Sequence, residues 1–564
     1  MEALDWLVIG VFFLALIGII VWVVRQKQND SADYFLGGRD ATWLAIGASS
    51  FASNIGSEHL IGLAGAGASS GMAMAHWEIQ GWMILILGWV FVPFYSRSMV
   101  YTMPEFLERR YNPQSRTILS VISLVSYVLT KVAVTVYAGG LVFQQVFGIK
   151  ELWGIDFFWI AAIGLVVLTA LYTIFGGMKS VLYTSVLQTP ILLLGSLIIL
   201  VLGFKELGGW DEMMRVCGAV TVNDYGDTMT NLIRSNDDAN FPWLGALIGS
   251  AIIGFWYWCT DQFIVQRVLS GKNEKEARRG TIFGAYLKLL PVFLFLIPGM
   301  IAFALHQKYI GAGGEGFLPM LANGTANADA AFPTLVAKLL PAGVKGLVVC
   351  GILAALMSSL ASLFNSSAML FTIDFYKRFR PETPEKKLVG IGQIATVVIV
   401  ILGILWIPIM RSVGDVLYTY LQDVQSVLAP GIAAAFLLGI CWKRTSAQGG
   451  MWGLIAGMII GLTRLGAKVY YSNAGEVADS TFKYLFYDMN WLFFCGWMFL
   501  FCIIVVIVVS LATEAPTAEK IQGLVFGTAT KEQKAATRAS WDHWDIIHTV
   551  IILAITGAFY WYFW

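Results

Sequence analysis

A run of polar side chains interrupts an otherwise apolar segment at residues 50–67, SFASNIGSEHLIGLAGAG. Asn54, Glu58 and His59 lie in it, together with three serines and several glycines. At membrane depth, hydrocarbon would offer these groups no hydrogen-bond partner. The segment therefore predicts an unwound helix that lines a wet cavity. In secondary transporters, helices of this kind hold the substrate and the coupling ion.

Two ionisable residues lie inside apolar segments further along the chain, Glu78 in MAMAHWEIQGW and Lys288 in GAYLKLLP. Each would cost roughly 2.5–3.5 kcal/mol near the centre of a membrane helix if it had no partner. One interpretation is a snorkelling lysine or a structural ion pair. The other is a pair of charges that faces a polar ligand.

Hydroxyl groups gather in the segment LMSSLASLFNSS, residues 356–367, which contains Ser358, Ser359 and Ser362. Sodium prefers oxygen ligands, and transporters supply them from hydroxyl groups and unwound backbone carbonyls. Small residues also let helices pack closely, so spacing alone favours packing. Only the pairing with the interrupted segment 50–67 makes this a specific prediction of a sodium site.

A second interrupted segment follows Gly254, where the sequence reads WYWCTDQ over residues 256–262. Tyr257 and Trp258 offer aromatic faces that could stack on the apolar face of a sugar ring. Asp261, Gln262 and Arg267 are better explained as a helix cap or an ion pair at the cytoplasmic end than as ligand contacts.

Composition places the chain in a membrane. Of its 564 residues, 57% are hydrophobic and only 13% are charged, whereas soluble domains carry about 25% charged residues. The net charge of +1 argues against a nucleic-acid partner. The N-terminus has no basic region or small-residue cleavage site, so residues 5–24 are predicted to be a retained span and not a signal peptide.

The sequence motifs predict no enzyme. The six cysteines show no CxxC or Cys/His metal spacing and form no recognisable disulfide framework. We also find no motif for a nucleophile–base pair or a phosphate-binding loop, and no appended soluble catalytic domain.

The elements that position the polar residues are predicted as fourteen membrane spans of about 20 residues or more. The second is long and polar at its centre, as a broken helix would be. The predicted spans cover residues 5–24, 42–70, 74–96, 117–147, 157–176, 180–203, 242–266, 281–306, 341–376, 388–410, 415–440, 448–470, 484–512 and 545–564.

Basic residues predict the orientation of these spans. Lys and Arg gather in the first, third, seventh, ninth and last loops, and the even-numbered loops are poor in them or acidic. The odd loops are therefore predicted to be cytoplasmic and both termini extracytoplasmic. Spans two and seven are both polar and interrupted, and they lie five spans apart, which indicates an inverted repeat.

Long motifs carry a resemblance to a known family. They are DYFLGGRDATWL (33–44), YTMPEFLERRY (101–111), LYTIFGGMKSVLYT (171–184), WYWCTDQFIVQRVLSGKN (256–273), GAYLKLLP (284–291), LMSSLASLFNSS, YLQDVQSVLAPG (420–431) and GIAAAFLLGICWKR (431–444). The chain closely resembles the sodium/solute symporter family, in its sodium–glucose cotransporter branch. The last two spans match weakly.

The resemblance implies an all-α polytopic membrane protein with a LeuT-like core of five plus five inverted helices and extra flanking helices. It divides the chain into 1–41, an extra helix and first cytoplasmic loop; 42–203, the first inverted repeat; 204–241, an extracellular loop; 242–440, the second inverted repeat; and 441–564, extra C-terminal helices.

The resemblance also implies positions for the ligands. The family's sodium site falls on the carbonyls of Ala52, Ile55 and Ala355 and the hydroxyls of Ser358 and Ser359. Its sugar-binding positions fall on Asn54, His59, Glu78, Tyr257, Trp258, Lys288 and Gln422. Its outer hydrophobic gate falls on Leu63, Trp77 and Tyr418, and its inner gate on Tyr257.

Three departures from the family pattern qualify these implications. The family usually has Asp at Ser185, and its two-sodium members have Thr at Ala361, so we predict one sodium ion per substrate. A polar sugar-binding residue is replaced by Gly254, which predicts extra space beside the sugar. The loop 307–340 lacks the cysteines of the animal proteins, so we predict a bacterial inner-membrane protein.

The predicted function is sodium-driven import of a monosaccharide of the glucose or galactose type by alternating access. The transporter is expected to work as a monomer in a lipid bilayer, with sodium and a small-molecule sugar as its ligands. Alternatives are a sodium-coupled transporter of inositol or another polyol, a transporter of an acidic sugar that pairs with Lys288, and a sugar sensor or leak pathway without productive transport.

Overall fold

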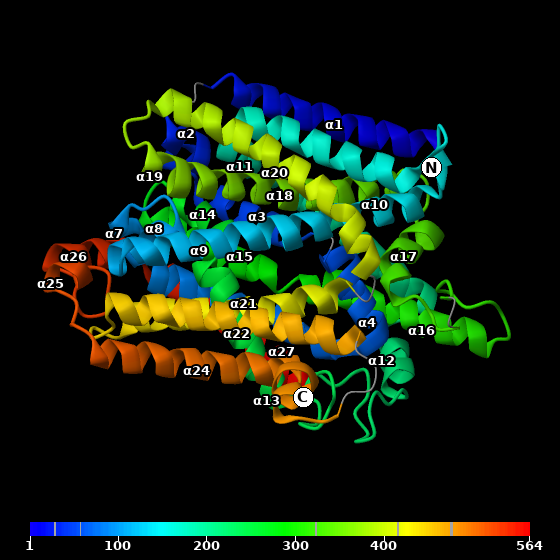
Figure 1. Cartoon of the computed structure of the whole chain (residues 1–564). Coiled ribbons are helices and arrows are strands. Elements are labelled where there is room, and N and C mark those ends of the chain that lie inside the picture. The colour runs from blue at the N-terminus through cyan, green and yellow to red at the C-terminus, as the bar shows by residue number, and fades with distance from the viewer. Residues whose placement is uncertain (27–29, 57, 322–323, 414–416, 474–477) are drawn as a thin grey trace.

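The computed structural model describes residues 1–26, 30–56, 58–321, 324–413, 417–473 and 478–564. Helices form the body of the molecule, and many of the long ones run side by side in roughly the same direction (Figure 1). Within the described residues, the sheet structure is one short antiparallel pair, β1 (Glu151–Leu152) with β2 (Ile155–Asp156). The prediction of an all-α membrane protein is confirmed.

The first part of the chain contains an N-terminal helix, a broken segment and a series of short helical pieces. These are α1 (Ala3–Val24), α2 (Ser31–Leu36), η1 (Gly37–Arg39), α3 (Trp43–Asn54), η2 (Glu58–Leu63), α4 (Ala64–Ser70), η3 (Gly71–Met74), α5 (Ala75–Glu78), α6 (Gly81–Ile86), η4 (Leu87–Phe91), α7 (Val92–Ser98) and α8 (Met103–Arg110).

The central part begins with α9 (Pro113–Ser126), η5 (Tyr127–Val132), α10 (Ala133–Phe147), α11 (Phe157–Leu207) and α12 (Trp210–Gly218). It continues with α13 (Trp243–Phe255), η6 (Trp256–Thr260), α14 (Gln262–Leu269), α15 (Glu274–Lys288), η7 (Val292–Leu296), α16 (Ile297–Gly311), η8 (Ala328–Ala330) and α17 (Ala331–Leu339).

The last part contains long helices joined by shorter ones. They are α18 (Val344–Met369), η9 (Leu370–Tyr376), α19 (Lys377–Phe379), α20 (Glu385–Val413), α21 (Leu417–Cys441), α22 (Ala447–Asn473), α23 (Thr481–Lys483), η10 (Tyr484–Asp488), α24 (Trp491–Ala512), α25 (Ala518–Ile521), α26 (Lys531–Ala539) and α27 (His543–Tyr562).

The predicted count of fourteen spans is not confirmed. Among the described residues, eleven helices are long and apolar enough to cross a membrane. The numbers differ partly because predicted neighbours run together: 157–176 and 180–203 both fall in α11, whose 51 residues would measure roughly 76 Å if straight. A hydrocarbon core is only about 30 Å thick. Gly177 breaks α11 with φ 53° and ψ −147°, at the predicted boundary.

The first interrupted segment is broken as predicted. Helix α3 ends at Asn54, Ile55 has an extended backbone with φ −81° and ψ 105°, and the chain resumes as the π-helical turn η2 followed by α4. The carbonyls of the last turn of α3 therefore lose the helical donors that would follow them. The break leaves backbone oxygens and polar side chains at the middle of the bundle.

The second interrupted segment is also broken, and the break lies within the predicted residues 256–262. Gly254 lies inside the helix α13, which continues as the π-helical turn η6 to Thr260. The extended residue is Asp261, with φ −77° and ψ 126°, and its side chain accepts the N–H of Phe263 to cap α14. The break is placed by a capping carboxylate and not by the glycine.

Glycines let α4, the second half of the first broken helix, approach α16 closely. A Cβ atom on Gly299 of α16 would lie 1.9 Å from the carbonyl oxygen of Ala64, and one on Gly67 of α4 would lie 2.2 Å from that of Leu296. Only glycine fits at both positions, and small residues bring membrane helices together in this way. Helix α4 is therefore packed directly on the backbone of α16.

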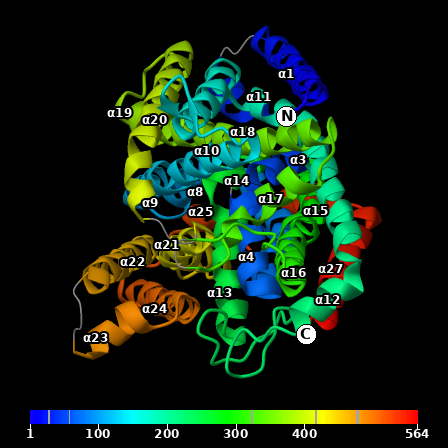
Figure 2. The same cartoon turned by 90° about the vertical axis from the view of Figure 1, so that its right-hand side faces the viewer.

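The two termini lie at one end of the bundle. Asp5 near the start of α1 accepts the N–H groups of Gly343 and Gly346, and the carbonyl of Phe563 accepts the N–H of Leu232. Figure 2 shows this end of the molecule, with α12 and α17. The elements α8, α19, α25 and α26 lie at the opposite end (Figure 1).

Candidate functional site

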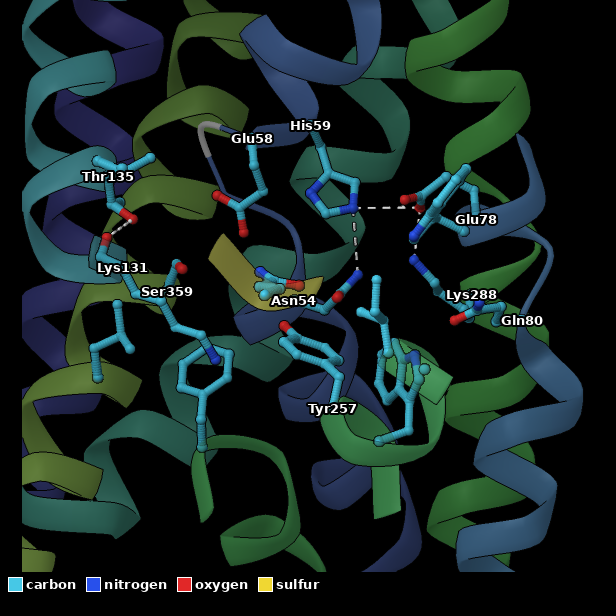
Figure 3. Close-up of a pocket in the computed structure, with 18 residues that line it drawn as sticks. Asn54, Glu58, His59, Glu78, Gln80, Lys131, Thr135, Tyr257, Lys288 and Ser359 are labelled. Atoms are coloured by element: carbon cyan, nitrogen blue, oxygen red, sulfur yellow. Dashed lines mark hydrogen bonds and ion pairs between the residues drawn. The ribbon is translucent and has the colours of Figure 1, made fainter. Parts of the chain in front are cut away.

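A buried cavity lies where the two broken helices meet (Figure 3). Its free space for water-sized spheres is about 60 Å³, several times the 10–15 Å³ or so that one water needs. Polar and aromatic side chains from η2, α5, η5, η6, α15 and α18 line it. Of the predicted substrate-binding residues, it brings together Asn54, His59, Glu78, Tyr257, Trp258 and Lys288.

An ion pair forms one wall of this cavity. The Lys288 Nζ lies 2.6 Å from the Glu78 Oε2, and both side chains are buried. The His59 Nε2 lies 3.3 Å from the same carboxylate oxygen and 3.4 Å from the amide nitrogen of Asn54. The two interpretations of these charges therefore coincide, because the pair is both a direct ion pair and part of the cavity lining.

Aromatic rings form the neighbouring surface. Tyr257 and Trp258 follow each other in the π-helical turn η6, with ring centroids 5.2 Å apart and nearly perpendicular planes. The Lys288 ammonium lies 5.5 Å from the centre of the Trp258 ring, within the range of a cation–π contact. The π-helical turn places both rings against the same cavity.

A second ion pair holds Lys131 at the cavity. The Lys131 Nζ lies 2.6 Å from the Asp261 Oδ2, and the Tyr127 hydroxyl donates to the other oxygen of Asp261. Four aromatic rings surround the ammonium at 4.7–5.3 Å, those of Tyr127, Trp256, Tyr257 and Phe263. The prediction that Asp261 serves as a helix cap and ion-pair partner is confirmed.

Arg267 does not follow that prediction. Its side chain is fully buried, and none of its guanidinium nitrogens has a hydrogen-bond partner among the described residues. The guanidinium carbon lies 5.2 Å from the centre of the Phe263 ring. The described contact of Arg267 is thus a cation–π contact and not an ion pair.

Five polar lining residues were not assigned a role from the sequence: Glu58, Gln80, Lys131, Thr135 and Gln425. The signal for Lys131 was present, because it is a charge inside the predicted span 117–147, as Glu78 and Lys288 are in theirs. Glu58 was noticed only as a polar interruption. Figure 3 shows its carboxylate pointing into the cavity beside Asn54 and His59.

The predicted extra space at Gly254 is absent. A Cβ atom on Gly254 would lie 2.4 Å from the Gln80 Oε1, and the Gln80 Nε2 donates to the carbonyl of Ser250 at 2.8 Å. A side chain at position 254 would collide with the buried amide group of Gln80, which already fills the space beside Gly254. This wall therefore offers the amide of Gln80 and no vacant pocket for an extra substituent.

The predicted sodium ligands lie beside the first break. Ala52, Ile55, Ala355, Ser358 and Ser359 are all buried, and α18 packs on α3. Ser359 also lines the cavity.

Pairs of hydroxyl groups join α18 to α11 and to α3. Ser358 and Ser185 have their Oγ atoms 3.2 Å apart, and those of Ser53 and Ser362 are 2.6 Å apart. The serines therefore do serve helix packing, and Ser359 is the one whose surroundings differ, because it faces the cavity.

The predicted outer gate is described in part. Leu63 is buried, and Trp77 lines the cavity with its ring stacked on that of Trp491 at a centroid distance of 5.5 Å. The side chains of Tyr418 and Gln422 lie outside the described residues. Gln425, further along α21, lines the cavity.

Residues 34–457 match the protein-family model described as "SSF: Sodium:solute symporter family". The chain belongs to the sodium:solute symporter family. It is therefore a sodium-coupled solute symporter that crosses the membrane several times, with sodium as the coupling ion.

Similar proteins within this family transport different solutes. Sodium/myo-inositol cotransporter 2 of Mus musculus is 37% identical over 542 residues, which cover 94% of this chain and 80% of the relative. Sodium/glucose cotransporter 4 of Danio rerio is 35% identical over 560 residues, which cover 96% and 84%.

A solved structure shows the same fold. The substrate-bound, outward-open form of a Na⁺-coupled sialic acid symporter superimposes with a TM-score of 0.73 at 22% sequence identity, and the match covers 92% of this chain and 99% of the other. The likeness supports the expected transporter fold and says nothing about the cargo.

Proposed function

We propose that this symporter imports a neutral, polyhydroxylated six-membered ring, foremost a hexose of the glucose or galactose type. The observation that carries the proposal is the lining of the cavity. Side chains that can accept and donate hydrogen bonds, among them Asn54, His59 and Gln80, surround it together with the rings of Tyr257 and Trp258. Hydroxyl groups match the former and the apolar face of a ring matches the latter.

Charge in the cavity favours a neutral cargo over an acidic sugar. Lys288 is already paired with Glu78 at 2.6 Å, and Glu58 adds a second carboxylate to the lining. Lys131 is likewise paired, with Asp261. A carboxylate on the cargo would have to displace one of these acids or lie beside them, and like charges in a buried site repel strongly.

Inositol is the second candidate. The relatives named above include a myo-inositol cotransporter, and Glu58 supplies an acceptor that a ring hydroxyl can satisfy. A pyranose ring oxygen has no proton to donate, whereas each ring carbon of an inositol carries a hydroxyl donor. A cavity rich in carboxylate oxygens is therefore well matched to inositol too.

Sodium is proposed to bind beside the first break. The carbonyls of Ala52, Ile55 and Ala355 and the hydroxyls of Ser358 and Ser359 would supply neutral oxygen ligands, which suit a hard cation. Since the ion would bridge α3 and α18, its binding would hold the two helices together. Because Ser359 also lines the cavity, the ion site and the solute site share a wall.

The proposed cycle is alternating access. Sodium binds first and holds the outward-open form, and the solute then bonds to Asn54, His59, Glu78, Lys288 and Gln422. Leu63, Trp77 and Tyr418 close above it. The inner half then opens, sodium leaves, and movement of Tyr257 releases the solute. We further propose that the protein works as a monomer in a bacterial inner membrane with both termini outside.

The test is uptake of labelled glucose, galactose and myo-inositol into proteoliposomes with an inward sodium gradient. Sodium-dependent accumulation that excess unlabelled hexose abolishes supports the hexose proposal, and accumulation blocked only by myo-inositol selects the second candidate. Inhibition by glucuronate alone would overturn the choice of a neutral cargo. Solute-evoked current without accumulation would instead indicate a sensor or leak pathway.

A further inference from the structure

A second cavity lies at the periphery of the bundle, away from the central site. Its volume is about 450 Å³, within the usual range of ligand pockets of about 300–1,000 Å³. It lies between α15 and α27, at the point where α3 begins, and α27 runs along the outer edge of the bundle beside α15 (Figure 2). Trp43, Arg279, Phe283, Tyr286, Trp544 and His548 are among its lining residues.

The rings of this groove lie at the end of the bundle that carries the basic loops. Trp43 is 41% exposed and Trp544 is 56% exposed, and the Tyr286 hydroxyl bonds to the His548 Nδ1 at 3.0 Å. Tryptophan and tyrosine concentrate at the headgroup level of membranes, where one side of the ring is apolar and the other is hydrated. The groove therefore opens where lipid headgroups lie.

Both signs of charge meet at the rim of the groove, where Arg279 and Asp545 line it and Asp542 lies outside the lining but pairs with Arg279. The Arg279 Nε lies 3.1 Å from the Asp545 Oδ1, and an outer nitrogen of its guanidinium lies 2.7 Å from the Asp542 Oδ2. Among the described residues, the remaining N–H groups of Arg279 have no protein acceptor, and its side chain is 33% exposed. Asp542 is 42% exposed. A donor for a phosphate and an acceptor for a cation are thus presented side by side.

An apolar path continues from the groove along α27. Ile551 and Ile555 follow Trp544 and His548 at helical spacing, so the four residues share one face of the helix. Ile551 is 41% exposed and Ile555 is 42% exposed. An acyl chain that leaves the groove has this face to lie on.

We propose that the groove binds a zwitterionic glycerophospholipid whose headgroup carries a primary ammonium, that is, a phosphatidylethanolamine. Its phosphate bonds to Arg279, its ammonium donates to Asp542, and its acyl chains follow Ile551 and Ile555. The exposed carboxylates disfavour an anionic headgroup such as phosphatidylglycerol. Quaternisation removes the N–H donors, so phosphatidylcholine binds more weakly.

The lipid would join elements that also form the central site. Trp43 begins α3, which carries Asn54, and α15 carries Lys288 at its end. A lipid bound between α15 and α27 would contact both α3 and α15 and would hold them against α27 at the periphery of the bundle. We therefore expect the bound lipid to stabilise the folded transporter.

The test uses the purified full chain in detergent with dioleoyl phosphatidylethanolamine, dioleoyl phosphatidylcholine and dioleoyl phosphatidylglycerol. Native mass spectrometry counts the lipid retained, and the midpoint of thermal unfolding reports stabilisation. Retention of the ethanolamine lipid is expected to exceed that of the other two by about tenfold, the worth of one charge-assisted hydrogen bond. Equal retention of all three, or stronger retention of the glycerol lipid, overturns the proposal.

Variants then locate the site. Asp542→Asn keeps a good N-cap for α27 but removes the charge, so the preference for ethanolamine over choline should fall to about parity. Trp544→Ala should reduce retention, whereas Trp497→Ala, a 62% exposed tryptophan on α24, should not. An unchanged preference in Asp542→Asn, or equal losses in the two tryptophan variants, contradicts the assignment. The comparison of lipids on the unaltered chain stands even if a variant fails to fold.

Discussion

Ser359 is the residue at which the proposed ion and solute sites meet. It is buried on α18 and lines the cavity, and all proposed sodium ligands are neutral oxygens. Loss of one hydroxyl therefore removes a sizeable part of the coordination. Ser359→Ala is expected to raise the sodium concentration for half-maximal uptake by about tenfold or more, the equivalent of one hydrogen bond to a charge.

Titration of uptake with sodium measures this effect. Ser367→Ala on the same helix is the matched control, because Ser367 is fully buried and its hydroxyl has no hydrogen-bond partner among the described residues. Its sodium dependence should remain that of the unaltered chain. An unchanged sodium requirement in Ser359→Ala would refute the proposed site.

The Glu78–Lys288 pair is expected to contribute to solute binding and to folding at once. Breaking a buried pair leaves one charge uncompensated, at a cost of about 3–5 kcal/mol, so Lys288→Ala should lose solute affinity and some stability. The double variant Glu78→Gln with Lys288→Met removes both charges and should regain stability while uptake stays low. Scintillation binding of solute and thermal unfolding separate the two effects. Recovery of uptake in the double variant would assign the pair a purely structural role.

The buried carboxyl group of Asp329, at the end of the bundle where the termini lie, is expected to make the stability of the folded state depend on pH. It lies in η8, outside the apolar spans, and its Oδ1 is buried without a hydrogen-bond partner among the described residues. Burial raises the pKa of Asp329 to about 6, above the ordinary value of about 3.9. The native state therefore holds this proton more tightly than the unfolded state, and its contribution to stability is lost as pH rises from about 4 to about 6.

Asp329→Asn should remove this loss. The variant is expected to unfold at a higher temperature than the unaltered chain at pH 7.5, and the difference should shrink as the pH approaches about 4. Asp237→Asn, at an exposed position, is the control and should shift neither value. A difference between Asp329→Asn and the unaltered chain that does not change with pH would show that the carboxylate does not titrate as stated.

For single residues, the sequence was most informative where a polar or charged side chain lies inside an apolar segment. Asn54, His59, Glu78 and Lys288 stand out in apolar segments, and they meet in one cavity. Gln80 could not be recognised in the same way, because an amide side chain at a helix junction can bond to many different groups. Its position against Gly254 depends on how α13 packs on the α5–α6 segment, and a sequence does not contain that distance.

Helix breaks are the features of the elements that matter most for the site. Residues 50–67 identified the first break because several polar groups coincide there with the end of α3. The second break was expected in residues 256–262, after Gly254, and it lies there at Asp261. Glycine weakens a helix without ending it, whereas a capping carboxylate starts a new one. The π-helical turns η2, η5 and η6 were not predicted, since they depend on neighbouring helices.

Gly177 provides a test of how the longest helix is divided. Its backbone has φ 53° and ψ −147°, and a Cβ there would lie 2.4 Å from the carbonyl oxygen of Tyr34. Gly177→Ala should therefore cost at least the 1–3 kcal/mol or so of such a backbone conformation and lower the unfolding temperature. Gly164→Ala in the same helix has no atom within 4 Å of its Cβ and should be neutral or slightly stabilising. Equal effects of the two substitutions would contradict the break.

The whole molecule couples one ion gradient to one solute in the proposed cycle. A sodium ion that crosses 100 mV releases about 2.3 kcal/mol, and a tenfold concentration gradient adds about 1.4 kcal/mol. Together these correspond to about 500-fold accumulation of a neutral solute. One ion is therefore sufficient for scavenging, and a second site is not required by the energetics.

The positions where a second sodium would be expected argue for a stoichiometry of one. Ser185 replaces a carboxylate, and its hydroxyl already donates to the carbonyl of Val181 at 2.6 Å. Ala361 has no side-chain oxygen and is fully buried. A second sodium at these positions would therefore lack the carboxylate and the hydroxyl that the family pattern implies there.

Reversal potentials measure this stoichiometry directly. For a neutral solute, a tenfold solute gradient should shift the reversal potential by about 59 mV if one sodium moves with each solute and by about 30 mV if two do. We expect the larger shift, at a fixed sodium gradient, in proteoliposomes fused to a planar bilayer. Ser185→Asp together with Ala361→Thr restores the family's oxygen groups and should move the value toward the smaller shift if those oxygens form a second site. A shift of about 30 mV for the unaltered chain would show that two ions bind without that carboxylate and hydroxyl.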